Sequence, residues 1–340
     1  MSQEAKKTVD NILKVACPLM LGGAILYWMY RDVNLASVES MLCNEMNWLW
    51  MLLSLPLGIM AQVFRGWRWK QTLAPLGEHP RTAVCVHAVF LSYASSLVIP
   101  RIGEFTRCAV LKRYDGVSFP KALGTVVTER AIDSLLLLLI TGLTLLWQMR
   151  MFSVFFAETG TSIDTIFAQF SFTGYVVTAI CAVAVLFLLH ILLKRLYIYN
   201  KVKATLRGIW QGVISLKGIS NIPLFILFTI GIWMSYFLQY YLTFFCFEFT
   251  ASLSLSCAVA TFVAGSIAVI VPTPNGAGPW HFAIKTMLIL YGVAEPGALC
   301  FVLIVHAVHT FLIIALGIYS WVSLGFVPKT KNIESILHDL

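Results

Sequence analysis

The sequence has few charged residues and lacks the motifs of familiar soluble enzymes. Only 12% of its 340 residues are Asp, Glu, Lys or Arg, whereas soluble domains usually carry about 25%. It contains no Walker A loop, no G-x-S-x-G, no H-E-x-x-H and no dinucleotide-binding glycine fingerprint. The eight cysteines form no C-x-x-C pair, which argues against a disulfide framework or a zinc site. We therefore expect no soluble domain, no cofactor, no metal and no enzymatic activity.

Long apolar runs are what the sequence has in abundance. Hydrophobic residues make up 59% of the chain, and several uncharged runs approach or exceed the roughly 20 residues that a helix needs to cross a bilayer. The apolar segments are 15–30, 48–64, 83–99, 122–149, 171–193, 222–247, 253–272, 280–292 and 296–326. This pattern predicts an all-α polytopic membrane protein with one transmembrane domain over residues 1–340. The first segment has no small-residue cleavage site after it, so we expect an uncleaved span.

The charges between these segments indicate which side of the membrane each connection faces. Segments 65–81 and 194–221 are strongly basic and are predicted to be cytoplasmic, whereas 31–47 and 150–170 are acidic and are predicted to lie outside. The net charge of +8 is thus assigned to the cytoplasmic membrane face, and we expect no nucleic-acid partner. Both termini are predicted to be cytoplasmic, in a bacterial inner membrane.

Nine simple crossings conflict with this charge distribution. If 83–99 crossed fully, the basic segment 101–121 would lie outside. A re-entrant hairpin over 82–114 that turns back at Pro100 keeps these charges in the cytoplasm. A second re-entrant hairpin, entering from outside, is predicted over 253–292 because "PTPNGAGP" interrupts that stretch.

The remaining segments then form two halves with the same order of elements. The six full spans are 15–30, 48–64, 122–149, 171–193, 222–247 and 296–326. Each half has three crossings, so the second half (171–326) is inverted relative to the first (12–150). Inverted repeats with broken helices that meet near the midplane are typical of secondary transporters.

The first hairpin contains the charged stretch "PRIGEFTR". Arg101, Glu104 and Arg107 are three residues apart, so on a helix they can share one face. Charges at membrane depth usually face a cavity or one another, and guanidinium groups match phosphate geometry. We interpret the stretch as a lipid-headgroup site in which Glu104 orients an arginine or accepts a proton. The alternative is a salt bridge that only pins the hairpin.

The stretch "TERAID" near the start of the third full span adds Glu129, Arg130 and Asp133. Glu129 and Asp133 are four residues apart and share a helix face. They either stabilise the positive end of the helix dipole at a cytoplasmic helix start or join Arg101 and Arg107 in one network.

The second hairpin contains "PTPNGAGPWHF". Pro274, Asn275, Gly276 and Gly278 predict a break, and the arm that follows would direct free backbone N–H groups toward the midplane, where they attract anions. His281 can face the same pocket. The alternative is a plain extracellular loop between two helices.

Arg65 and Arg68 follow the second span in "FRGWRWKQTL". They either gather anionic lipid at an entrance to the site or are ordinary interface residues beside tryptophans.

Taken together, four motifs resemble one family. "RGWRW", "PRIGEFTRCAVL", "TERAID" and "PTPNGAGPWHFAI" are similar to those of the flippase-like transmembrane domain, best known as the transmembrane region of lysylphosphatidylglycerol synthases of the multiple-peptide-resistance type. The resemblance covers about residues 10 to 325. In the family an acidic residue usually follows the late glycine motif, where this sequence has His281. We expect a stand-alone member without the synthase domain.

The resemblance implies binding or movement of a lipid with an anionic headgroup: a phospholipid, an aminoacylated lipid, a hopanoid or a polyprenyl-phosphate carrier. The leading hypothesis is a lipid translocase that holds the headgroup between the two hairpins. One alternative is a membrane-embedded enzyme that modifies a lipid headgroup, with Glu129 or Asp133 as base. Another is a partner that presents lipid to a synthase or glycosyltransferase. The sequence leaves open whether the protein forms homo-oligomers or associates with a lipid-modifying enzyme.

Overall fold

The computed structural model describes residues 46–149 and 218–328, together with the single residues Met20, Tyr27, Val154, Trp210 and Ile214. Within these ranges the regular structure is entirely helical. The predicted spans 15–30 and 171–193 lie outside the two continuous ranges.

Four long helices in the described ranges are apolar and long enough to cross a membrane. They are α3 (Trp48–Leu73), α6 (Phe119–Trp147), α11 (Ile222–Thr243) and α15 (Glu295–Gly325). They expose large apolar side chains such as Leu138, Ile226 and Phe311, as expected of helices that face lipid. These helices confirm four of the predicted spans and a polytopic membrane protein.

The second predicted span is longer than expected. α3 continues to Leu73, and a short 3₁₀ turn, η2 (Ala74–Leu76), follows it. The prediction that this span ends at residue 64 is therefore wrong, because Arg65 and Arg68 lie inside the helix and are buried there. Both arginines form ion pairs with carboxylates on another helix, and these pairs replace contact with water.

Two helical hairpins occupy the predicted positions. The first consists of α4 (Thr82–Val98) and α5 (Gly103–Asp115). The second consists of α13 (Leu255–Ala268) and α14 (Pro279–Leu290), with the 3₁₀ turn η5 (Pro274–Gly276) between them. At about 1.5 Å per residue, these arms of 12 to 17 residues are shorter than the roughly 30 Å hydrocarbon core. In each hairpin the two arms pack against each other.

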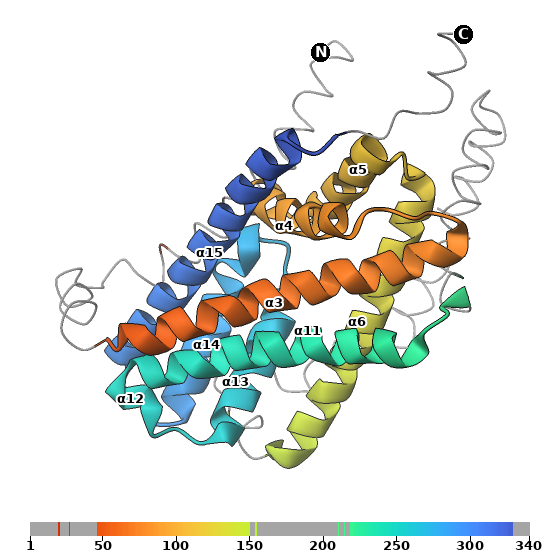
Figure 1. Cartoon of the computed structure of the whole chain (residues 1–340). Helices are drawn as coiled ribbons and strands as arrows, with labels where there is room; N and C mark the ends of the chain where they lie inside the picture. Colours follow the sequence, from red (N-terminus) through yellow and green to blue (C-terminus); the bar gives the residue numbers. More distant parts are fainter. Residues whose placement is uncertain are drawn as a thin grey trace, which may run out of the picture.

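The helices α3 and α11 run side by side in opposite directions through the middle of the molecule (Figure 1). The backbone N–H of Asn47, just before α3, donates to the carbonyl oxygen of Cys246 in η4 (Phe244–Cys246), which follows α11 (N···O 2.7 Å). Gly231 on α11 lies against the ring of Phe64 on α3, and a side chain at residue 231 would crowd that ring. The short helix α12 (Glu248–Ala251) then leads to the second hairpin.

The first arm of each hairpin packs on a long helix of the other half of the chain. α4 packs on α15, where His87 Nδ1 lies 3.1 Å from Ser320 Oγ and Gly317 fits against Ala94. α13 packs on α6. The two halves are thus interlocked, and each hairpin is held by helices from both.

Candidate anion-binding site

Five charged side chains from three helices meet in the interior between α3, α5 and α6. They are Arg65 and Arg68 on α3, Arg107 on α5, and Glu129 and Asp133 on α6. Their exposed fractions are only 4%, 0%, 1%, 2% and 8%, in that order. We call these five residues the buried charge cluster. Charged groups are almost never buried this completely unless they pair with one another.

Glu129 lies at the centre of the cluster and contacts all three arginines. Its Oε1 accepts from Arg65 Nη1 at 2.6 Å and lies 3.2 Å from Arg68 Nη2. Its Oε2 accepts from Arg107 Nη1 at 3.0 Å. A single carboxylate therefore ties the first hairpin, through Arg107, to α3 and α6.

Asp133 completes the cluster one helical turn further along α6. Its Oδ2 accepts from Arg65 Nη1 at 2.7 Å, and its Oδ1 accepts from Arg68 Nη2 at 2.8 Å. The spacing explains this arrangement, because residues three or four apart on a helix share a face. The pair on α3 and the pair on α6 thus face each other across the helix contact.

Aromatic and hydroxyl side chains surround the cluster. The Arg107 guanidinium lies 4.8 Å from the ring centroid of Trp69, whose Nε1 donates to Thr125 Oγ1 at 2.9 Å. Arg68 Nη1 donates to Thr229 Oγ1 of α11 at 3.3 Å. An arginine over a tryptophan face gains a favourable cation–π interaction, and more so when it is removed from water.

The cluster keeps one positive charge and one free two-nitrogen donor edge, on Arg107; among the described residues, Arg65 Nε and Arg68 Nε are single buried donors that also have no hydrogen-bond partner. Three guanidinium groups face two carboxylates, so one positive charge has no counter-ion within the cluster. Among the described residues, Arg107 Nε and Nη2 are buried without a hydrogen-bond partner. These two nitrogens form the side of the guanidinium that binds carboxylate or phosphate through two parallel N–H···O bonds. The arrangement can therefore hold an oxyanion.

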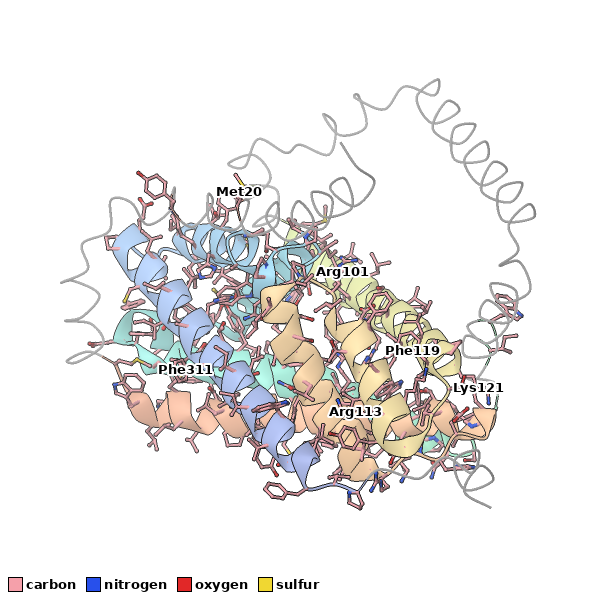
Figure 2. All side chains as sticks on the ribbon, turned by 90° about the horizontal axis from the view of Figure 1, so that it is seen from above. Met20, Arg101, Arg113, Phe119, Lys121 and Phe311 are labelled. Atoms are coloured by element: carbon pink, nitrogen blue, oxygen red, sulfur yellow. The ribbon has the colours of Figure 1, made fainter. Side chains whose placement is uncertain are left out.

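The structure separates the three charged residues of "PRIGEFTR", so the prediction that they share one helix face is wrong. Arg101 precedes α5, has a positive φ of 65° and is exposed. Its Nη2 donates to the carbonyl oxygen of Ile270, beyond α13, at 3.1 Å. Figure 2 shows Arg101 at the tip of the first hairpin and Arg113 at the opposite end. The helix begins only at Gly103, which leaves Arg101 in the turn.

Glu104 and Arg107 do lie on α5, but they contact different residues of α6. Glu104 pairs with Arg130, Oε1 to Nε, at 3.1 Å, and both side chains are partly exposed. Arg107 pairs with the preceding residue, Glu129. Of the network expected from the sequence, Arg107, Glu129 and Asp133 do come together, whereas Arg101 does not join them. Glu104 and Arg130 form a separate pair beside the cluster.

Gly103 of the same stretch is required by close packing between the arms of the hairpin. Its N–H donates to Ser96 Oγ at 3.2 Å. A Cβ at this position would collide with the carbonyl oxygen of Ser92. The glycine thus lets α5 approach α4 closely enough to bring Arg107 inward.

The residues predicted for the second hairpin are held by α15 and by the hairpin itself. Asn275 (φ 51°) donates from Nδ2 to Thr310 Oγ1 at 2.8 Å, and its carbonyl oxygen lies 3.1 Å from His306 Nε2. Gly276 and Gly278, which have φ of 71° and 91°, make the turn between Pro274 and α14. His281 is buried, and its ring centroid lies 4.4 Å from that of His306. These contacts fix the break that "PTPNGAGP" predicted.

Arg65 and Arg68 are the largest departure from the sequence-based interpretation. They are neither at an entrance nor at the membrane interface, because both are buried and paired with Glu129 and Asp133. The contributions of Thr229 and Trp69 were not anticipated either. The signal in the sequence for this contact was an R-x-x-R pair on one helix and an E-x-x-x-D pair on another, because each spacing places both residues of the pair on one helix face.

These features define a polytopic helical membrane protein with the buried charge cluster between its helices. The chain belongs to the family of the lysylphosphatidylglycerol synthase TM region, which it matches over residues 15–317. Over 154 residues it is also 26% identical to glycosyltransferase AglD of Haloferax volcanii. That alignment covers 43% of this chain and only 25% of the length of the relative. No solved structure shows significant similarity to the chain.

Proposed function

We propose that the protein is a lipid translocase that binds an anionic lipid headgroup at the buried charge cluster. The observation that carries this proposal is the buried Nε–Nη2 edge of Arg107, which has no partner among the described residues. A phosphate of a phospholipid, an aminoacylated lipid or a polyprenyl-phosphate carrier would complete this edge and bring negative charge to the excess positive charge of the cluster. The acyl or prenyl chains would remain in the surrounding lipid.

The arrangement of the helices supports movement of the headgroup across the membrane. In this proposal residues 12–150 and 171–326 are inverted halves, and the two hairpins are re-entrant from opposite sides of a bacterial inner membrane. The packing of α4 on α15 and of α13 on α6 is the reciprocal arrangement that such a repeat requires. Rocking of one half against the other would then expose the cluster to each side in turn. Both termini would lie in the cytoplasm.

The contacts of the two carboxylates favour transport over chemistry at the headgroup. A general base needs an oxygen that is free to take a proton from the substrate. Both oxygens of Glu129 and both oxygens of Asp133 instead accept hydrogen bonds from, or form ion pairs with, guanidinium groups. The two carboxylates are therefore arranged to neutralise the arginines rather than to accept a proton from a substrate.

The partial similarity to a glycosyltransferase favours a second candidate, in which the protein presents a lipid to a partner enzyme. Co-purification from native membranes distinguishes the two candidates. A lipid presenter is expected to retain a synthase or glycosyltransferase in stoichiometric amount and to show no transport when it is alone. A translocase is expected to move lipid without a partner.

Reconstitution into liposomes tests the translocase directly. Proteoliposomes with a fluorescent anionic phospholipid are treated with a membrane-impermeant quencher, which reports movement between leaflets. We expect movement with the wild type and its loss with Arg107→Gln. Arg113→Gln is the matched control, because Arg113 lies on the same helix but is exposed. Equal movement by wild type and Arg107→Gln, or no movement by the wild type, would contradict the proposal.

A further inference from the structure

We infer that the buried charge cluster selects headgroups with one net negative charge, as in a phosphodiester, over phosphomonoesters with two, and that the two carboxylates Glu129 and Asp133 set this preference. The inference rests on the proposed function, because it assigns the ligand of the same site. It narrows the expected ligand from a lipid with any anionic headgroup to a lipid whose headgroup carries one net negative charge. Its basis is the charge balance of the cluster together with the donor geometry of Arg107.

The charge balance leaves room for one negative charge. The nearby pair Arg130 and Glu104 is neutral overall. Among the residues that the structure describes, the remaining titratable side chains that interact with Arg65 and Arg107 are Tyr93, Tyr236 and Cys108, which carry no charge in their ordinary protonated forms. Over these residues the net charge is therefore that of the five clustered side chains, one positive charge. In a site shielded from water an unbalanced charge of either sign is costly. A monoanion balances the cluster, whereas a dianion leaves one negative charge without a partner.

The free edge of Arg107 matches the same class of ligand. A phosphodiester has two non-bridging oxygens that share a single charge, and Arg107 Nε and Nη2 offer two parallel donors. The third nitrogen, Nη1, is occupied by Glu129 Oε2 at 3.0 Å. A ligand therefore meets only one bidentate edge of Arg107, and the extra oxygen of a phosphomonoester finds no further donor on this residue.

Glu129 acts here as a resident counter-ion. It touches all three guanidinium groups, so it already fills part of the arginine surface that a more highly charged ligand would use. Replacement by glutamine retains a side chain of similar shape and raises the net charge of the cluster to two. The preferred ligand should then change from a monoanion to a dianion.

The experiment measures binding by native mass spectrometry of the purified full-length protein at pH 8. The probes are phosphatidylglycerol, phosphatidate and phosphatidylcholine with identical acyl chains, which carry one, nearly two and no net negative charges. We expect the wild type to bind phosphatidylglycerol about tenfold more tightly than phosphatidate, the scale of one charge-assisted hydrogen bond. Glu129→Gln and Asp133→Asn should both reverse this order. Arg113→Gln should leave it unchanged.

Two results would overturn the inference. The first is wild-type protein that binds phosphatidate as tightly as phosphatidylglycerol. The second is a wild-type order that persists in folded Glu129→Gln or Asp133→Asn. The proposed function fails separately: a wild type with the expected order of binding but no lipid movement would exclude the translocase and leave the selectivity intact.

Discussion

Arg101 Nη2 lies 3.1 Å from the carbonyl oxygen of Ile270, and this hydrogen bond joins the tips of the two hairpins. The donor comes from a turn residue with φ of 65°, a conformation that costs a residue other than glycine roughly 1–2 kcal/mol. The acceptor lies just beyond α13, before the turn that leads to α14. In a protein whose hairpins move against each other, this contact would open and close with them.

The first prediction concerns this contact between the hairpin tips. We expect Arg101→Ala and Arg101→Gly to lose lipid transport while the protein remains folded in the membrane. Glycine relieves the positive φ, so Arg101→Gly should be more stable than Arg101→Ala by about 1 kcal/mol. Thermal unfolding in detergent and transport in proteoliposomes measure the two effects. Wild-type transport in either variant would show that the contact has no role in the movement.

The second prediction tests the close packing of the first hairpin. Gly103→Ala places a methyl group against the carbonyl oxygen of Ser92, so we expect a destabilisation of about 1–3 kcal/mol. Gly142→Ala on α6 is the matched control, because a Cβ there meets no atom within 4 Å. Its expected effect is a stabilisation of about 0.5–1 kcal/mol. Denaturation of the two purified variants provides the comparison, and equal stabilities would contradict the packing argument.

The third prediction compares a buried ion pair with an exposed one. Glu129→Ala leaves three buried guanidinium groups with a single carboxylate, which should cost about 3–5 kcal/mol. Glu295→Ala breaks the pair with Lys285, in which the Glu295 side chain is 60% exposed, and should cost at most about 1 kcal/mol. Thermal unfolding in the same detergent reports both. If Glu129→Ala is no more destabilising than Glu295→Ala, the cluster does not bear on stability.

The fourth prediction tests the topology with single introduced cysteines. Ser118→Cys should react with a membrane-impermeant maleimide only after the cytoplasmic side is opened, and Ala294→Cys should react in intact cells. The background is suitable because five natural cysteines are buried, namely Cys85, Cys108, Cys246, Cys257 and Cys300; the other three are replaced by serine. Labelling of Ser118→Cys only from outside would disprove the re-entrant hairpin over 82–114.

Apolar length and turn residues predicted the positions of most helices in the described ranges. The hairpin predicted over 82–114 runs from Thr82 to Asp115, and the one predicted over 253–292 contains helices from Leu255 to Leu290. These features depend on local sequence: a run of apolar residues, a proline or glycine break, and a short arm.

The charged residues were harder to place, because their partners lie far away in the sequence. Arg65 was interpreted as an interface or entrance residue, yet its partner Glu129 is 64 positions further on. Nothing local distinguishes a snorkelling arginine from one that is neutralised by another helix. Arg101 was wrongly predicted to lie on the helix. The start of α5 at Gly103 and the positive φ of Arg101 depend on how the two arms pack, which the local sequence does not show.

The separation between Arg65 and Glu129 also constrains how the protein enters the membrane. Arg65 and Arg68 are synthesised well before the carboxylates that neutralise them, with 64 to 68 positions between the bonded residues of Arg65. During that interval α3 carries two charges that lipid does not tolerate. We therefore expect α3 to reach its final position only after α6 has entered the membrane, so that these two helices of the first half insert together rather than independently.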